Sequence, residues 1–395
     1  MISFDEAVAT VREAATSLGA ERVPLREAHR RVLADAVVAR VSAPPADVSA
    51  MDGYAVRDAD LQSLPARLPI AGESFAGQGF KGQLPPAQCV RIFTGAAVPA
   101  GADRVVVQEV VRREGDEAIF SEMPGAGRHI RRAGSDFRRG ETLLDVGVLL
   151  RPGALVTAAG ADVAELTVWR RPRVAILGTG DELVEPGTAC EREGCIPESV
   201  SFGVAALAAE VGAEVVETLR LPDDLSRMRS AAARSLDGAD VVVVTGGASV
   251  GERDFAKTMW DALGLELLFS KVAIKPGKPV WLGRVNDKLV IGLPGNPTSA
   301  LVTSRLLMVP LLHGLAGRSP SDALVWKRLP LAAPLGPTGS RETFSRAFVE
   351  AGKVRLFDHQ DSSSQKVLAA ATLLVRRPPG EEPVPAGALL EVLDF

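Results

Sequence analysis

The chain has 395 residues, more than one ordinary hydrophobic core organises, so about two to four domains are expected. Hydrophobic residues make up 46% of the sequence and charged residues 24%, as in an ordinary globular protein. The formal net charge of −4 and the lack of a long basic run argue against a nucleic-acid-binding protein.

Cysteine usage and the N-terminus favour a cytoplasmic protein. Cys89, Cys190 and Cys195 cannot all pair, which suits a reducing compartment, and scattered histidines without a C-x-x-C pattern predict no zinc site. Asp5 and Glu6 are untypical of a signal peptide. No apolar stretch approaches the roughly 20 residues of a membrane helix, so no membrane partner is expected.

The N-terminal segment carries helix signals and then a strand signal. Ser3-Phe-Asp-Glu6 is a capping box before apolar residues at helical spacing, and Gly19 is expected to end that helix. We predict a second short helix over Pro24 to Leu33 and a strand over Asp35 to Val41, which the prolines at 44 and 45 break.

Residues 44–142 have a different pattern, with short β-branched runs between clusters of glycine and proline. This pattern predicts an inserted β-rich domain. Residues 143–170 show a strand, a short helix and a strand, and are expected to join residues 20–43 in a connecting domain.

From Pro172 strands and helices alternate, and Asp223-Asp224 can cap the helix that follows them. The alternation predicts an α/β domain with a mostly parallel sheet, over residues 1–19 and 171–318. Alternating short strands behind a Pro- and Gly-rich linker predict a small β domain over residues 323–395. The expected fold class is therefore a multidomain chain of α/β and β-rich parts.

Three dense turns lie between Thr245 and Ser299, each at the edge of an apolar run. They read Thr245-Gly-Gly-Ala-Ser-Val-Gly251, Ala273-Ile-Lys-Pro-Gly-Lys-Pro279 and Ile291-Gly-Leu-Pro-Gly-Asn-Pro297. Their glycines fall where strands end and helices begin, and ligands bind at that edge of an open α/β sheet. Glycine and proline also punctuate ordinary loops, and for any single turn that interpretation is equally good.

The chemistry of these turns favours an anion. Gly246 and Gly247 let backbone N–H groups approach a ligand closely, and Lys275 and Lys278 supply two positive charges. Asp254 would repel an anion unless a divalent cation such as Mg²⁺ bridged them.

Earlier motifs occur in the same order as these turns. They are Ser49-Ala-Met-Asp-Gly-Tyr-Ala55, Arg91-Ile-Phe-Thr-Gly-Ala96 and Gly180-Asp-Glu-Leu183. Together with the three turns they resemble the molybdopterin molybdenumtransferase family, which includes MoeA and the E domain of gephyrin. The resemblance covers most of the chain and is strongest through residue 318. It implies a molybdopterin-binding type of α/β domain.

The resemblance also implies the last step of molybdenum cofactor synthesis. Adenylylated molybdopterin and molybdate enter, the phosphoanhydride is hydrolysed, AMP leaves, and molybdenum is placed on the dithiolene. Family members are homodimers whose cleft takes the β-rich domain from one subunit and the α/β domain from the other. A molybdopterin adenylyltransferase is a further candidate partner. The sequence leaves open whether tungstate replaces molybdate.

Carboxylates are the candidates for catalysis. Asp52, Glu182, Asp224 and Asp254 are expected to act in acid–base or metal chemistry, and Glu182, Asp254 and Asp136 are the candidate metal ligands. Each has a structural alternative, since Asp52 lies in a turn signal, Asp224 can cap a helix, and Asp136 lies in a charged loop with several arginines. The resemblance favours a functional role, with either Asp223 or Asp224 near the site.

Hydroxyl, glycine, lysine and proline positions at the turns are the candidates for holding the substrate. These residues are Thr94, Gly246, Gly247, Ser249, Lys275, Lys278, Pro294, Asn296 and Pro297. Ser249 also has the central position of a G-x-S-x-G nucleophile elbow, for which His313 is the only downstream histidine before the linker. We treat that hydrolase interpretation as the weaker one.

Two segments depart from the family pattern. Glu198-Ser199-Val200 stands where Asp-Ser-Asn is usual, and Ser362-Ser-Ser-Gln365 and Ala370-Ala371-Thr372 replace glycine- and asparagine-containing patterns near the C-terminus. The departures concern recognition of the organic part of the substrate. They support one alternative, a non-catalytic cofactor-binding or scaffold paralogue. A molybdopterin adenylyltransferase is another alternative, because its α/β domain is similar.

Overall fold

The computed structural model describes residues 1–246 and 255–395. The chain forms two compact units and passes between them four times: within β1 (Ala20–Pro24), after His29, after Ala34 and within β12 (Glu165–Trp169). Unit 1 comprises Met1–Glu21, Arg30–Ala34 and Thr167–Phe395, and unit 2 comprises Arg22–His29 and Asp35–Leu166. The four domains expected from the sequence divide the chain more finely, and their boundaries stay a prediction.

Unit 1 contains a six-stranded sheet in the order β16-β13-β17-β21-β20-β18. Its strands are β13 (Arg173–Thr179), β16 (Glu214–Leu221), β17 (Val241–Thr245), β18 (Glu266–Phe269), β20 (Trp281–Val285) and β21 (Lys288–Leu293). The ladder from β16 to β21 is parallel, whereas β20 and β18 are antiparallel to their neighbours. The prediction of a mostly parallel sheet is confirmed.

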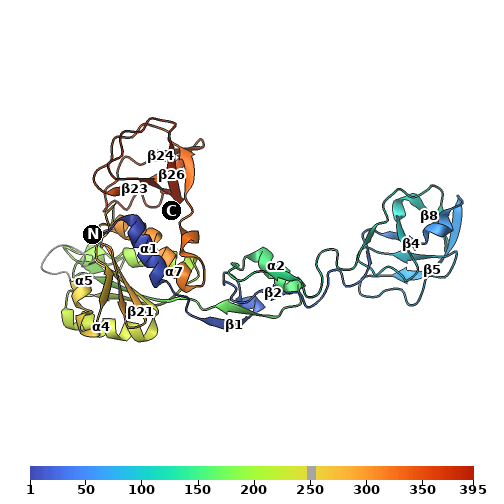
Figure 1. The fold of residues 1–395 in the computed structure, drawn as a ribbon, viewed down its shortest axis with the longest axis horizontal. Helices are drawn as coiled ribbons and strands as arrows, with labels where there is room; N and C mark the ends of the chain where they lie inside the picture. Colours follow the sequence, from blue (N-terminus) through green and yellow to red (C-terminus); the bar gives the residue numbers. More distant parts are fainter. Residues whose placement is uncertain (247–254) are drawn as a thin grey trace. The chain divides into compact units, whose positions relative to one another are not determined.

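Helices cover both faces of this sheet, so successive residues of its strands enter different cores. Along β13, Val174 and Ile176 pack with α1, α3 and α7, whereas Ala175 and Leu177 pack with α4 and α5. In Figure 1, α1 and α7 lie on one side of β21 and α4 on the other. The helices are α1 (Phe4–Ala14), α3 (Val200–Glu210), α4 (Leu225–Gly238), α5 (Phe255–Thr258), α6 (Pro297–Thr303) and α7 (Val309–Leu315).

A single helical run, α6 to α7, follows the third dense turn. A π-helical segment over Ser304–Met308 joins the two helices. Pro297–Leu315 has 19 residues with a mean hydropathy of 1.2, so the expectation that no stretch approaches the length of a membrane helix is wrong. The structure buries 89% of its most apolar window, as expected for the core helix of a globular domain.

The capping box at the N-terminus is confirmed, but other N-terminal predictions are wrong. Helix α1 ends at Ala14 rather than near Gly19, because the Leu18 amide donates to the carbonyl of Leu315 instead of continuing the helix. In place of a helix over 24–33 there is only a 3₁₀ turn at Leu25–Glu27. The end of this segment is extended and pairs with the region of β12, since the Ala34 amide donates to the carbonyl of Thr167.

The C-terminal part of unit 1 forms a second six-stranded sheet, which confirms the predicted β-rich part. Strand β19, which carries Lys275, pairs with β23 in this sheet. The strands are β19 (Ile274–Lys275), β22 (Lys327–Pro330), β23 (Glu342–Glu350), β24 (Lys353–Leu356), β25 (Leu373–Arg377) and β26 (Leu389–Asp394).

Unit 2 is built on a six-stranded sheet in the order β7-β4-β6-β5-β9-β8, as the β-branched runs predict. Its strands are β4 (Gly53–Val56), β5 (Ala66–Ser74), β6 (Cys89–Ile92), β7 (Arg104–Val107), β8 (Val111–Glu114) and β9 (Glu117–Phe120). Tyr54, Leu68 and Phe120 are buried in its core. Short pairs and one helix complete the unit: β2 (Val37–Val38) with β11 (Thr142–Leu144), β3 (Val48–Ser49) with β10 (Ile130–Arg131), and α2 (Pro152–Gly160). The strand expected over 35–41 is thus only β2.

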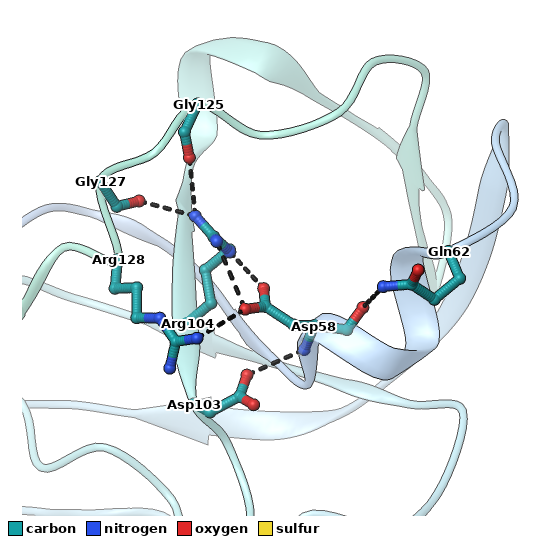
Figure 2. A network of polar contacts seen from close by, with 7 residues as sticks. All are labelled: Asp58, Gln62, Asp103, Arg104, Gly125, Gly127 and Arg128. Atoms are coloured by element: carbon teal, nitrogen blue, oxygen red, sulfur yellow. Dashed lines mark hydrogen bonds and ion pairs between the residues drawn. The ribbon is translucent and has the colours of Figure 1, made fainter.

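A partly buried arginine fixes the loop of unit 2 that leads into β10. Arg104 pairs with Asp58 and donates from Nη1 to the carbonyls of Gly125 and Gly127, both at 2.8 Å. Arg128 also pairs with Asp58, at 3.2 Å (Figure 2). Because the planar guanidinium holds several acceptors at once, the loop has a defined conformation.

Candidate functional site

A cavity of about 830 Å³ lies in unit 1, at the carboxyl ends of the parallel strands. Thr179, Thr245 and the turn after β21 are among its lining residues. Five of the residues singled out from the sequence line this one cavity: Glu182, Gly246, Pro294, Asn296 and Pro297. With Pro279 of the second turn, the structure therefore brings together residues of all three dense turns and of the Gly180-Asp-Glu-Leu183 motif.

Glycine allows the strand ends to approach each other closely. Gly246 has a φ of +89°, and a Cβ there would lie 2.3 Å from the carbonyl oxygen of Thr179. A Cβ at Gly295 would lie 3.3 Å from the Cα of Gly246. A side chain at Gly246 would separate β13 from β17, so this position requires glycine.

Three carboxylate residues line the cavity: Glu182, Glu198 and Asp223. Glu182 folds back over Gly180, whose Cβ, if present, would lie 2.5 Å from the Glu182 carboxylate. Asp223 lies nearby in the lining, and its amide donates to Asp181 Oδ1 at 3.0 Å. Asp224 instead caps α4, because its Oδ1 accepts from the Arg227 amide at 2.9 Å. A catalytic role for Asp224 stays a prediction.

Sequence reasoning missed a buried carboxylate in the lining. Glu198 is 6% exposed, and its carboxylate accepts hydrogen bonds from the amide of Ser201 at 2.8 Å and from the Ser201 hydroxyl. Glu198 lies two residues before the first residue of α3, and an acidic residue at the start of an apolar helix is a recognisable signal for bonding to its first amides. From the sequence alone, Glu198 is identified only as a departure from the family pattern.

The C-terminal domain also contributes to the cavity, which sequence reasoning missed. Ser363 and Gln365, in the loop between β24 and β25, line it. The loop is held to the edge of the α/β sheet by Asn296 Nδ2, which donates to Ser362 Oγ at 3.2 Å. Thr298 Oγ1 donates to the Ser364 carbonyl at 2.8 Å. No local sequence signal could have predicted these contacts, because about 66 residues separate the partners.

Lys275 ends β19 and Lys278 lies on the turn that follows; both side chains are exposed, and neither lines the cavity. Pro279 of the same turn does line it. The turn packs against α6, since Gly277 has a φ of +105° and a Cβ there would lie 2.2 Å from Thr303 Cγ2. The lysines are thus carried on a fixed turn next to the cavity.

In unit 2, Asp52 and Thr94 meet. Asp52 Oδ1 accepts from both the amide and the hydroxyl of Thr94, each at 2.8 Å. The Thr94 amide, more than its hydroxyl, holds the pKa of Asp52 below its usual value, so this carboxylate is ionised at neutral pH. The neighbouring Arg91 lies over the rings of Tyr54 and Phe93.

Asp136 is an exposed residue of unit 2 whose amide donates to the carbonyl of Ala43 at 3.0 Å. Gly247, Ser249 and Asp254 lie outside the described residues. Among residues 1–246 and 255–395, no group of three or more His, Cys, Asp and Glu side chains is placed to hold a metal ion.

His313 lies in the core of unit 1, which disfavours the hydrolase interpretation. It is 5% exposed, and its Nε2 lies 3.1 Å from Nη1 of Arg318. Burial, and then the charges of Arg318 and Arg305, lower its pKa to about 3. A neutral, buried imidazole bonded to a cation is poorly suited to activate a serine at the sheet edge.

Comparison with known proteins agrees with this architecture. Residues 2–161 match the MoeA N-terminal region (domain I and II), and residues 175–314 match a probable molybdopterin binding domain. The chain is 37% identical to molybdopterin molybdenumtransferase 2 of Mycobacterium tuberculosis, over 94% of each chain. It is 38% identical to the molybdopterin molybdenumtransferase of Haemophilus influenzae, over 84% of this chain and 80% of that one.

A solved structure supports the same conclusion for the whole chain. The molybdopterin biosynthesis MoeA protein of Pyrococcus horikoshii has a TM-score of 0.84 and 27% sequence identity, and the match covers 100% of both chains. The fold, the matched domains and the relatives all indicate the same family. The chain therefore belongs to the molybdopterin molybdenumtransferase family, transferases of molybdenum cofactor biosynthesis.

Proposed function

We propose that this chain inserts molybdenum from molybdate into adenylylated molybdopterin, hydrolyses the phosphoanhydride and releases AMP. The observation that carries the proposal is the cavity at the strand ends, which is lined by the carboxylates of Glu182 and Asp223 and by Gly246, a residue without a side chain. A cavity of about 830 Å³ is large enough for a substrate that combines a heterocycle with phosphates.

Both proposed substrates are anions, so cations and backbone N–H groups should hold them. Lys275 and Lys278 provide two exposed ammonium groups on the turn next to the cavity. They would bind the phosphates or molybdate and offset the negative charge that develops on the leaving AMP. Thr94 would contact an anion through its hydroxyl.

A divalent cation, Mg²⁺, is part of the proposal. Magnesium in proteins is often bound by one or two carboxylates, with waters and substrate phosphates as the other ligands, and the oxygen donors in the cavity suit it. Glu182 would hold it with Asp254, and Asp136 is a further candidate ligand. When bound, the ion would polarise the phosphoanhydride. Glu182 acts either as its ligand or as the base that takes a proton from the attacking water.

We extend the proposal to a cytoplasmic homodimer. The ionised Asp52 and the substrate cavity belong to different units of the chain, and the resemblance implies that a complete site combines residues from two subunits. Asp52 would then take part in metal or acid–base chemistry on the substrate held by the other subunit. A molybdopterin adenylyltransferase that supplies the substrate would be a natural partner.

The test is AMP release from adenylylated molybdopterin, measured with and without molybdate and with Mg²⁺ or a chelator. The proposal expects release only when molybdate and the divalent cation are both present. Tight binding of the pterin without release would instead support a scaffold. Consumption of ATP with free molybdopterin would support an adenylyltransferase.

A further inference from the structure

Four flat side-chain groups, Tyr54, Arg91, Phe93 and Phe75, form a planar stack in unit 2. The Arg91 guanidinium lies over the rings of Tyr54 and Phe93, at 5.1 and 4.9 Å from their centroids. Phe93 stacks in turn on Phe75, with ring centroids 4.5 Å apart and an angle of 10° between the rings. Tyr54 is buried, whereas Phe75 is 42% exposed. The planar stack therefore begins in the core and ends in an aromatic ring that solvent reaches.

The exposed end of the planar stack lies beside Asp52. Phe75 directly follows β5, and Phe93 directly follows β6, its parallel neighbour. Asp52 directly precedes β4, which is antiparallel to β6. The ends of parallel strands and the start of an antiparallel partner meet at one edge of a sheet, so these residues lie together. Thr94, next to Phe93 in the chain, bonds to Asp52 and fixes the ionised carboxylate at this edge.

The exposed ring is held on a fixed hairpin. The amides of Phe75 and Gln78 each donate to the carbonyl of the other residue, both at 3.0 Å. Ser74 is fully buried, and its hydroxyl donates to the carbonyl of Ala97 at 2.9 Å and accepts from the Phe80 amide at 3.3 Å. Because these bonds fix the hairpin before a ligand arrives, Phe75 can offer its ring at little cost in conformational entropy.

An exposed ring that is backed by a second ring and a guanidinium suits a flat, uncharged heterocycle. Nucleobases stack on aromatic side chains in this way, and the contact needs no hydrogen bond to the base. Phosphate and molybdate do not suit the ring itself, because they call for cations and N–H groups, and the ionised Asp52 beside it would repel them.

The proposed substrate has two heterocycles, the pterin and the adenine. The cavity of unit 1 belongs to the molybdopterin-binding domain and would take the pterin half. In the proposed function Asp52 acts at the phosphoanhydride, which joins the pterin half to the adenosine half. A flat surface beside Asp52 therefore suits the adenosine half.

We propose that Phe75, at the exposed end of the planar stack, binds the adenine ring of the adenylylated substrate and of the AMP that leaves. This inference rests on the proposed function for the identity of the nucleotide. Phe75 is a binding residue in this account, so its ring should contribute to the affinity for the nucleotide rather than to the chemical step.

The first test measures binding of AMP and of ribose 5-phosphate to the full chain by titration calorimetry. Wild type should bind AMP more tightly than ribose 5-phosphate, which lacks the base. Phe75→Ala should weaken AMP binding roughly fivefold to a hundredfold, the effect of one stacked base, and leave ribose 5-phosphate binding as in wild type.

Three further variants separate the ring from its apolar volume and from general effects. Phe75→Trp keeps a flat ring and should retain AMP affinity within about threefold. Phe75→Leu keeps apolar volume without a ring and should weaken AMP binding as Phe75→Ala does. Met123→Ala removes a large apolar side chain elsewhere in unit 2, where Met123 is 62% exposed, and should change nothing.

The second test is turnover. Phe75→Ala should raise the KM for adenylylated molybdopterin by the factor seen for AMP, with kcat within about twofold of wild type. Its affinity for molybdopterin without the adenylyl group, followed by pterin fluorescence, should equal that of wild type. An equal weakening of molybdopterin binding would show that Phe75 contacts the pterin, and would overturn the assignment to adenine.

The failures of this inference and of the proposed function are distinguishable. Equal AMP affinity in wild type and Phe75→Ala, or wild-type binding of AMP no tighter than of ribose 5-phosphate, would overturn the adenine site while molybdate-dependent AMP release still upheld the proposed function. If wild type released no AMP from the adenylylated substrate, the proposed function would fail. Loss of AMP binding in Phe75→Ala and its retention in Phe75→Trp would nevertheless uphold the adenine site.

Discussion

Glu182 differs from its neighbour Glu185 in what surrounds it. Glu182 lies just after β13 and lines the cavity, whereas Glu185 is 70% exposed and pairs with Arg220 at 3.6 Å. If a carboxylate acts in phosphoanhydride cleavage, its removal should lower the rate of AMP release. We expect Glu182→Gln and Glu182→Ala to fold normally and to lose AMP release by about a hundredfold or more.

Glu185→Ala is the matched control for this prediction, and thermal unfolding checks that all variants are folded. Retention of wild-type AMP release by Glu182→Ala would remove Glu182 from the catalytic candidates. Asp223, a second carboxylate in the lining, would then be the next residue to replace, since Glu198 is already bonded to Ser201.

Lys275 and Lys278 are expected to bind anions from their fixed turn. Each Lys→Ala change should lower the affinity for molybdate or for the phosphates roughly tenfold or more, because a charge-assisted hydrogen bond contributes about 1.5–3 kcal/mol. Added salt should weaken wild-type binding more than binding by the variants. The exposed Lys353→Ala on β24 is the control. Equal affinity and equal salt dependence in all these proteins would assign the two lysines to a solvated surface.

At the scale of single residues, the sequence predicts positions at strand ends well. Gly246, Pro294 and Asn296 follow apolar runs too short for helices, and the structure places all of them in the cavity. The sequence could not predict Ser363 and Gln365, because their position depends on Arg346 and on contacts across the domain.

The helical run from α6 to α7 carries a buried histidine that should make stability depend on pH. His313 has its pKa lowered to about 3, from 6.5, mainly by burial. Between these values the unfolded chain binds a proton at His313 and the folded chain does not. The stability contribution is therefore present above pH 6.5 and is lost as the pH falls towards 3.

Replacement of His313 should reduce this dependence. Urea titrations of His313→Gln at about pH 7, 6 and 5 should show a shallower fall in unfolding free energy than wild type shows. The exposed His29→Gln variant controls for loss of a histidine as such. An identical pH slope in wild type and His313→Gln would show that the folded chain protonates His313 freely.

At the scale of helices and strands, prediction succeeded where a pattern had one physical explanation. Val241 to Val244 form a buried parallel strand because both faces of the sheet are covered, which requires an unbroken apolar run. The prediction of a helix over residues 24–33 failed, because local signals favoured a helix but Leu33 and Ala34 pair with the segment around Val168. Pairing over so long a separation leaves no local signal.

The whole molecule consists of two units, and candidate residues occur in both. Asp52 and Thr94 belong to unit 2, and Glu182 belongs to unit 1. In a homodimer with two shared sites, Asp52→Ala and Glu182→Ala should each be inactive alone. A mixed dimer would carry both lesions in one site and none in the other. Random mixing should therefore restore about a quarter of wild-type activity.

Tagged purification identifies the mixed dimers for this measurement. Confirmed mixed dimers without activity would show that each site is complete within one subunit. A chain that is monomeric in solution would rule out the homodimer itself, and the complementation would then not be expected.

The most direct measurement is a single turnover with adenylylated molybdopterin, molybdate and Mg²⁺, in which released AMP and pterin-bound molybdenum are counted together. Coupled insertion predicts one molybdenum bound for each AMP released, and neither product when molybdate is left out. Release of AMP at the same rate without molybdate, or molybdenum on the pterin without AMP release, would contradict the proposed function.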